Sequence, residues 1–113
     1  MRLHYSELDS GIRLIKLNGT LDIHGVNEVD REFVRHCTGK NVCVLVDLSK
    51  VNFISSIGIP LLINSARLLV RQGGKMVLLN PKKFVEDSLE IMGISLIIPI
   101  YHNFNAALSA LTK

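Results

Sequence analysis

The chain has 113 residues, of which 48% are hydrophobic, and its 13 lysines and arginines exceed its 10 aspartates and glutamates by three. This length supports one hydrophobic core and is too short for two, so we expect a single domain over residues 1–113. No run of like charge is longer than Lys82-Lys83, so we expect no nucleic-acid binding. The N-terminus lacks the apolar segment of a signal peptide, and no apolar run approaches the ~18 residues of a membrane span. A cytoplasmic protein without membrane insertion is therefore expected.

Two short apolar runs at the start of the chain predict a β-hairpin. They cover Leu3 to Glu7 and Ile12 to Leu17, and the turn-forming residues Asp9-Ser10-Gly11 separate them. Asn18-Gly19-Thr20 is expected to close the second strand.

The segment after the hairpin has the spacing of a helix. Thr20 or Asp22 can cap this helix, and Thr38-Gly39 ends it. Its apolar positions recur three or four residues apart, at Val26, Val29, Phe33 and Cys37.

The central part of the chain predicts a buried strand, a loop and a second helix. The continuous apolar block from Val42 to Val46 is typical of a strand buried on both faces of a parallel sheet. After a loop, apolar residues at helical spacing predict a helix from Ser56 to about Gln72. Ser56 is placed to cap this helix, and Pro60 falls in its first turn, where a missing N–H costs least.

The C-terminal third continues the alternation of strands and helices. Its expected elements are a strand over Met76 to Leu79, a helix over residues 82–92 with Val85, Leu89 and Met92 facing inward, a short strand over Leu96 to Ile98, and a helix capped by Asn103 with the apolar stripe Phe104, Ala107, Leu108 and Leu111. This order predicts an α/β fold with a mostly parallel central sheet, an N-terminal antiparallel hairpin and about four helices.

Neither a catalytic nor a metal-site pattern is visible in the sequence. Cys37 and Cys43 lack the close Cys or His partners of a zinc site, and we interpret both as reduced core residues. The four histidines lie on separate predicted elements, and no nucleophile elbow, phosphate-binding loop or dinucleotide fingerprint is present. We therefore expect neither enzymatic activity nor a metal or other cofactor.

Five motifs, taken together and in order, resemble a known family. They are Leu17-Asn18-Gly19-Thr20-Leu21-Asp22, Val44-Leu45-Val46-Asp47-Leu48-Ser49, Phe53-Ile54-Ser55-Ser56-Ile57-Gly58, Gly73-Gly74-Lys75-Met76-Val77-Leu78, and the ending from Met92-Gly93-Ile94 to Ala106-Ala107-Leu108. The sequence resembles a STAS domain, and more closely a single-domain bacterial anti-sigma factor antagonist, over nearly the whole chain.

This resemblance implies a protein that switches partners. In such antagonists the unphosphorylated form binds an anti-sigma factor that is also a serine kinase, phosphorylation of one serine ends the interaction, and a serine phosphatase restores it. Alignment on Gly58 puts the phosphoacceptor at Ser56. The chain departs from the family pattern at two positions, because Ser55 stands where an aspartate is usual and Ile57 stands where a second serine is usual. Ser55 is therefore a rival acceptor.

The expected partner-binding surface combines two loops and one helix. It consists of Asp22, Ile23, His24, Ser55, Ser56, Ile57, Gly58, Asn64 and Arg67. For Asp22 a simple role as a helix cap stays open, whereas Asn52 and Phe53 are expected to shape the loop and to pack in the core.

The expected partners are an anti-sigma factor serine kinase and a serine phosphatase, with the chain itself a monomer or weak dimer. The alternative function is a STAS scaffold or ligand-sensing module, not phosphorylated, in a lipid-transport or stress-signalling complex.

Overall fold

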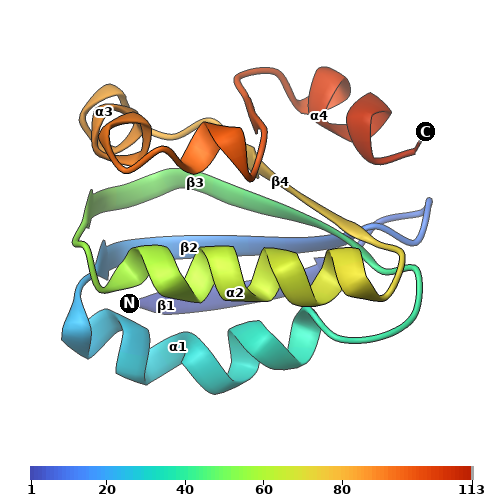
Figure 1. Cartoon of the computed structure of the whole chain (residues 1–113), viewed down its shortest axis with the longest axis horizontal. Coiled ribbons are helices and arrows are strands. Elements are labelled where there is room, and N and C mark those ends of the chain that lie inside the picture. The colour runs from blue at the N-terminus through green and yellow to red at the C-terminus, as the bar shows by residue number, and fades with distance from the viewer. Residues whose placement is uncertain (113) are drawn as a thin grey trace.

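A computed structural model describes residues 1–112 and shows five strands joined in one mixed sheet (Figure 1). The strands lie side by side in chain order and are β1 (Arg2–Glu7), β2 (Arg13–Leu21), β3 (Cys43–Ile54), β4 (Lys75–Leu79) and β5 (Ile100–Tyr101). The helices are α1 (Ile23–His36), α2 (Gly58–Arg71), α3 (Lys83–Ile91) and α4 (Phe104–Leu111), with a 3₁₀ turn, η1 (Ile94–Leu96), after α3. β1 pairs antiparallel with β2 and the other neighbours are parallel, which confirms the predicted α/β fold and its N-terminal hairpin.

The sheet carries a hydrophobic core on each face. On the larger side, buried side chains of α1, α2 and α3, such as Phe33, Leu62 and Leu89, pack against alternate strand residues. On the other side, α4 contributes Ala107 to a smaller cluster that includes Leu45 of β3. Figure 1 shows α1 and α2 together on one side of the strands and α4 on the other. α4 packs mainly on β3, β4 and β5, so the outer face of β1 and of the second half of β2 stays exposed.

β3 is longer than predicted. The segment after Asp47, which was expected to be a loop, continues the strand as far as Ile54. The buried residues of this extension are Leu48, Val51 and Ile54, three positions apart instead of two. Two register shifts against β2 explain the spacing, because each shift inserts one extra residue on β3. The bulges hide the alternation by which a strand is recognised in a sequence.

The prediction of a strand over Leu96 to Ile98 is wrong. Gly93 adopts a left-handed conformation (φ 72°) after α3, and Ile94–Leu96 then forms η1. Ile94 and Ile98 fill the larger core, so the apolar run serves packing instead of pairing. The last strand is Ile100–Tyr101, a short edge strand after Pro99.

The cap of α4, the two cysteines and the lengths of the helices complete the fold. Asn103 caps α4 as predicted, since its Oδ1 accepts a hydrogen bond from the N–H of Ala106 (2.9 Å), but Phe104 is 43% exposed and stands outside the buried stripe. Cys37 is buried, Cys43 is half-buried, and neither forms a disulfide. Within residues 1–112 no helix is long and apolar enough to cross a lipid bilayer.

Candidate functional site

The turn between β3 and α2 carries the two candidate serines. α2 begins at Gly58, one or two residues later than predicted, and Ile57 occupies the capping position with helical backbone angles (φ −77°, ψ −21°). No side chain caps this end of the helix, so the prediction that Ser56 is the N-cap is wrong. Pro60 lies in the first turn of α2, as expected.

Ser55 ties the turn to the end of β2. Its hydroxyl donates to the carbonyl oxygen of Leu21 (3.3 Å) and accepts from the N–H of Ile57 (3.3 Å). Its own N–H also donates to the Leu21 carbonyl (3.0 Å). The side chain is half-buried. Ser55 therefore performs the local hydrogen bonding that the sequence suggested for Ser56.

Ser56 is exposed, and its hydroxyl makes no hydrogen bond with any described residue of the chain. It stands directly before Ile57, the capping residue of α2, and the first turn of this helix has no acidic residue and no capping side chain. The free N–H groups of a helix N-terminus carry a partial positive charge that favours an anion placed beside them. A negative group on Ser56 would consequently meet a favourable local field and no competing hydrogen bond.

Gly58 lets the start of α2 approach the end of β2. A Cβ atom at this position would lie 2.8 Å from Cγ of Leu21 and 2.9 Å from the Leu21 carbonyl oxygen. Contacts this short force the neighbouring atoms to move, and a backbone carbonyl cannot move cheaply. The absence of a side chain at residue 58 therefore helps to hold the serine turn close against β2.

The first residues of α1 lie beside the serine turn, because Leu21, which Ser55 contacts, directly precedes them. Asp22 is the N-cap of α1, and its carboxylate accepts from the N–H of Gly25 (2.9 Å). This hydrogen bond is the main reason that the pKa of Asp22 is lowered. Ile23 is 54% exposed and His24 is exposed. The predicted residues of the two loops thus share one edge of the molecule.

Large apolar side chains surround the two serines. A hollow of about 200 Å³ is lined by Ser55 and Ser56 together with Ile91 and Met92 of the α3 end. Met92 was expected to face inward but is 48% exposed, and Ile91 is 84% exposed. Sequence reasoning missed both residues as surface features. The available signal was Ile91, an apolar residue outside the inward-facing positions of its own helix.

The predicted residues on α2 separate into two places. Asn64 lines a groove of about 340 Å³ between α1 and α2, which also includes Ile57. Arg67 lies in a different hollow, next to Ile97. The structure therefore joins Asn64 to the serine turn through Ile57 and leaves Arg67 farther along the helix.

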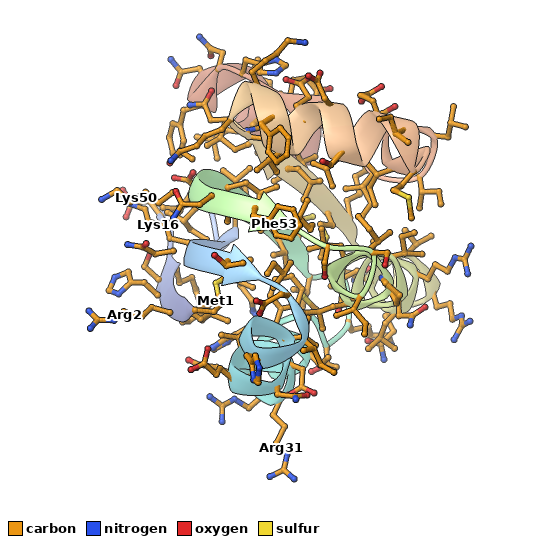
Figure 2. The ribbon with its side chains drawn as sticks, turned by 90° about the vertical axis from the view of Figure 1, so that its left-hand side faces the viewer. Met1, Arg2, Lys16, Arg31, Lys50 and Phe53 are labelled. Carbon is orange, nitrogen blue, oxygen red and sulfur yellow. The ribbon has the colours of Figure 1, made fainter. Side chains whose placement is uncertain are left out.

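Phe53 is not a core residue, contrary to expectation. Its ring is 41% exposed and stacks against Phe84 of α3, with 6.3 Å between the ring centroids. Figure 2 shows Phe53 on the end of the sheet that faces the viewer. Asn52 is also exposed, and its Oδ1 accepts from Nζ of Lys82 (2.9 Å).

The described part of the chain holds no group of three or more His, Cys, Asp or Glu side chains arranged for a metal ion. Burial raises the pKa of the Cys37 thiol to about 12, so this thiol stays protonated and unreactive near neutral pH.

Comparison with known proteins relates this chain to a family and to characterised relatives. The model of the STAS domain family matches residues 6–107. The "Anti-sigma F factor antagonist" of Paenibacillus polymyxa is 26% identical over 103 residues, which cover 89% of this chain and 87% of that protein.

Solved structures show the same fold. A STAS domain protein from Planctomyces limnophilus, described as an anti-sigma-factor antagonist, superposes with a TM-score of 0.86 at 19% identity over 98% of both chains. The anti-sigma factor antagonist SpoIIAA in its unphosphorylated form gives a TM-score of 0.74 at 20% identity, with 93% of this chain and 92% of that chain covered. Its phosphorylated form gives 0.67 at 19% identity, with 93% and 96% covered. The sheet order, the N-terminal hairpin and the family match over most of the sequence lead to one conclusion: the chain belongs to the STAS domain family.

Proposed function

We propose that the chain is an anti-sigma factor antagonist of a bacterial partner-switching pathway. In its unphosphorylated form it binds an anti-sigma factor that is a serine kinase, phosphorylation of Ser56 ends this binding, and a serine phosphatase restores it. The observation that carries the proposal is the free, exposed hydroxyl of Ser56 at the start of α2. The name of the Paenibacillus polymyxa relative and the two phosphorylation forms of SpoIIAA support the same mechanism.

The two serines differ in the hydrogen bonds that phosphorylation of their hydroxyl groups would disrupt. Phosphorylation of Ser55 would remove the hydrogen that its hydroxyl donates to the Leu21 carbonyl and place a charge against half-buried backbone. Phosphorylation of Ser56 breaks no hydrogen bond within the described residues. The contrast favours Ser56 as the acceptor and gives Ser55 a structural role at the position where the family usually has an aspartate.

Phosphorylation acts on docking and leaves the fold in place. A phosphate adds about 1.5 to 2 negative charges, and a helix N-terminus stabilises such an anion by about 0.3 to 1 kcal/mol at an exposed site. The same charge stands beside the exposed apolar side chains of Ile57, Ile91 and Met92. A partner that covers these side chains would have to desolvate the phosphate, which is unfavourable.

The proposed docking surface contains predicted residues and two further residues that the structure adds. It comprises the start of α1 with Asp22, Ile23 and His24, the turn from Ser55 to Gly58, and Asn64 on α2, to which the structure adds Ile91 and Met92. Arg67, the remaining predicted residue, lies in the separate hollow next to Ile97.

The direct test is phosphorylation of matched variants. Wild-type protein, Ser55→Ala and Ser56→Ala are each incubated with ATP and the anti-sigma factor kinases of the same organism, and the intact mass is measured. We expect one added phosphate on wild-type protein and on Ser55→Ala, and none on Ser56→Ala. A phosphate on Ser56→Ala would show that Ser55 or another residue is the acceptor. An unmodified wild-type protein would favour the alternative, a STAS scaffold that is not phosphorylated.

A further inference from the structure

A separate hollow lies on the exposed outer face of β1, β2 and β3. It has a volume of about 350 Å³, and its polar lining includes Arg2, His4, Lys16, Asn18, Ser49 and Lys50. Figure 2 shows Arg2, Lys16 and Lys50 together on the side of the sheet away from α2. This basic pocket shares no lining residue with the hollow at Ser56.

Strand register brings these side chains together. Arg2 lies opposite Asn18, which lies opposite Lys50, and His4 lies opposite Lys16 in the next row of the same face. Adjacent strands are about 4.8 Å apart, so each row spans three strands within about 10 Å. The three basic residues therefore come from three strands and face the same small space.

The first bulge of β3, between Asp47 and Lys50, places Lys50 in the basic pocket. Between the pairs Lys16 with Asp47 and Asn18 with Lys50, β3 has one residue more than β2. Leu48 and Val51 are both buried in the core, and the two residues between them line the pocket. Without the extra residue, regular alternation would pair Ser49 with Asn18 and turn residue 50 toward the core.

The positive charge of this pocket is only partly compensated by its lining, because three cations stand with one carboxylate. The side chains of Arg2, Lys16 and Lys50 form no ion pair or hydrogen bond with any described residue. The one carboxylate of the lining, Asp47, accepts from the N–H of Ser49 (2.9 Å) and forms no salt bridge with a lysine or arginine among residues 1–112. No two of the three cations lie directly opposite each other, because Asn18 separates Arg2 from Lys50 and Asp47 lies opposite Lys16. The pocket therefore keeps an excess of positive charge that an anion could neutralise.

We infer that the basic pocket binds a small ligand with two or three phosphate groups. Its volume lies within the usual range for small-molecule sites, and the three cations supply the charge-assisted hydrogen bonds that phosphate oxygens accept. A soluble oligophosphate compound and the clustered phosphates of neighbouring lipid headgroups in a membrane present the same chemistry to this site. The inference is independent of the proposed role of Ser56.

The test uses inorganic tripolyphosphate and a charge-matched control. Lys16→Gln/Lys50→Gln removes two charges from the pocket, whereas Arg31→Gln/Arg35→Gln removes two charges from the exposed side of α1. Arg31 points away from the pocket in Figure 2. Titration calorimetry at low ionic strength should give a Kd for tripolyphosphate about tenfold or more weaker in the pocket variant, and a Kd in the control within about threefold of wild type.

Thermal unfolding and vesicle sedimentation complete the test. Tripolyphosphate should raise the melting temperature of wild-type protein and of the control, and raise that of the pocket variant much less. Binding to phosphatidylcholine vesicles only when they contain phosphatidic acid, with loss in the pocket variant, would identify the lipid headgroup as the source. Equal weakening in both double variants, or no tripolyphosphate binding by wild-type protein, would overturn the inference.

Discussion

Ser55 and Ser56 are neighbours in sequence but differ in their hydrogen bonds and therefore in what their loss should do. Ser56→Ala removes a hydroxyl that contacts no described residue, so we expect the free energy of unfolding to change by less than about 0.5 kcal/mol. Ser55→Ala removes the hydrogen bonds to Leu21 and Ile57 and should destabilise by about 1 kcal/mol. Urea unfolding of the two variants measures both values. A larger loss in Ser56→Ala would mean that this serine caps α2 after all.

Protonation of His36, the last residue of α1, should make the stability of the folded protein depend on pH. Its ring stacks on Tyr5 with 3.8 Å between centroids, and burial, followed by the charge of Arg35, lowers its pKa. The unfolded chain therefore binds a proton at a higher pH than the folded chain. The contribution of neutral His36 to the free energy of unfolding is fully present above the pKa of about 6.5 that a histidine has in the unfolded chain. This contribution is lost as the pH falls from there through the pKa of His36 in the folded protein.

The measurement is the melting temperature at about pH 8 and about pH 5 for wild-type protein and His36→Phe. His4, His24 and His102 remain in the variant and serve as an internal control. The loss of melting temperature between the two conditions should be smaller in His36→Phe. An equal loss in both proteins would assign the effect to other groups.

The close contact between the start of α2 and the end of β2 sets the position of the serine turn. The substitution Gly58→Ala, which adds one methyl group, tests this contact. An alanine normally stabilises a helix relative to glycine by about 1 kcal/mol. In Gly58→Ala the added Cβ would meet Leu21, so we expect the opposite sign, a loss of about 1 to 3 kcal/mol. Thermal or urea unfolding checks this directly. A stabilised Gly58→Ala protein would show that β2 and α2 do not approach as closely as described.

Most elements could be predicted because their core residues recur with a regular period. α1 and α2 each present such a pattern, β4 is a continuous apolar run, and Asp22 and Asn103 mark helix starts by capping chemistry. β3 could not be traced past Val46, because its bulges set the buried residues three apart. The run Leu96 to Ile98 has the composition of a strand, but packing in the core decides its structure.

At the scale of the whole molecule, the site was only partly visible in the sequence. A serine before a helix is a strong local signal for a cap, yet the carbonyl that holds Ser55 belongs to Leu21, 34 residues earlier in the chain. Ile91 and Met92 reach the same hollow from α3, which no local pattern indicates. The basic pocket likewise depends on the register of three strands and on a bulge. Such features arise from tertiary structure and have no signature in a single segment.

The two proposed surfaces should act independently, because the basic pocket and the hollow at Ser56 share no lining residue. Lys16→Gln/Lys50→Gln should bind the anti-sigma factor partner with an affinity within about threefold of wild type. Ser56→Asp should bind tripolyphosphate as wild type does. Biolayer interferometry and calorimetry on the same preparations measure both. Loss of both activities in either variant would point to a single shared surface.

A negative charge at Ser56 should end partner binding without unfolding the protein. The most direct test is the Kd of the anti-sigma factor partner for wild-type protein, for the enzymatically phosphorylated protein and for Ser56→Asp, with melting temperatures measured in parallel. We expect both charged forms to bind at least about tenfold more weakly, with nearly unchanged melting temperatures. Equal affinity of the unmodified and phosphorylated forms would contradict this expectation.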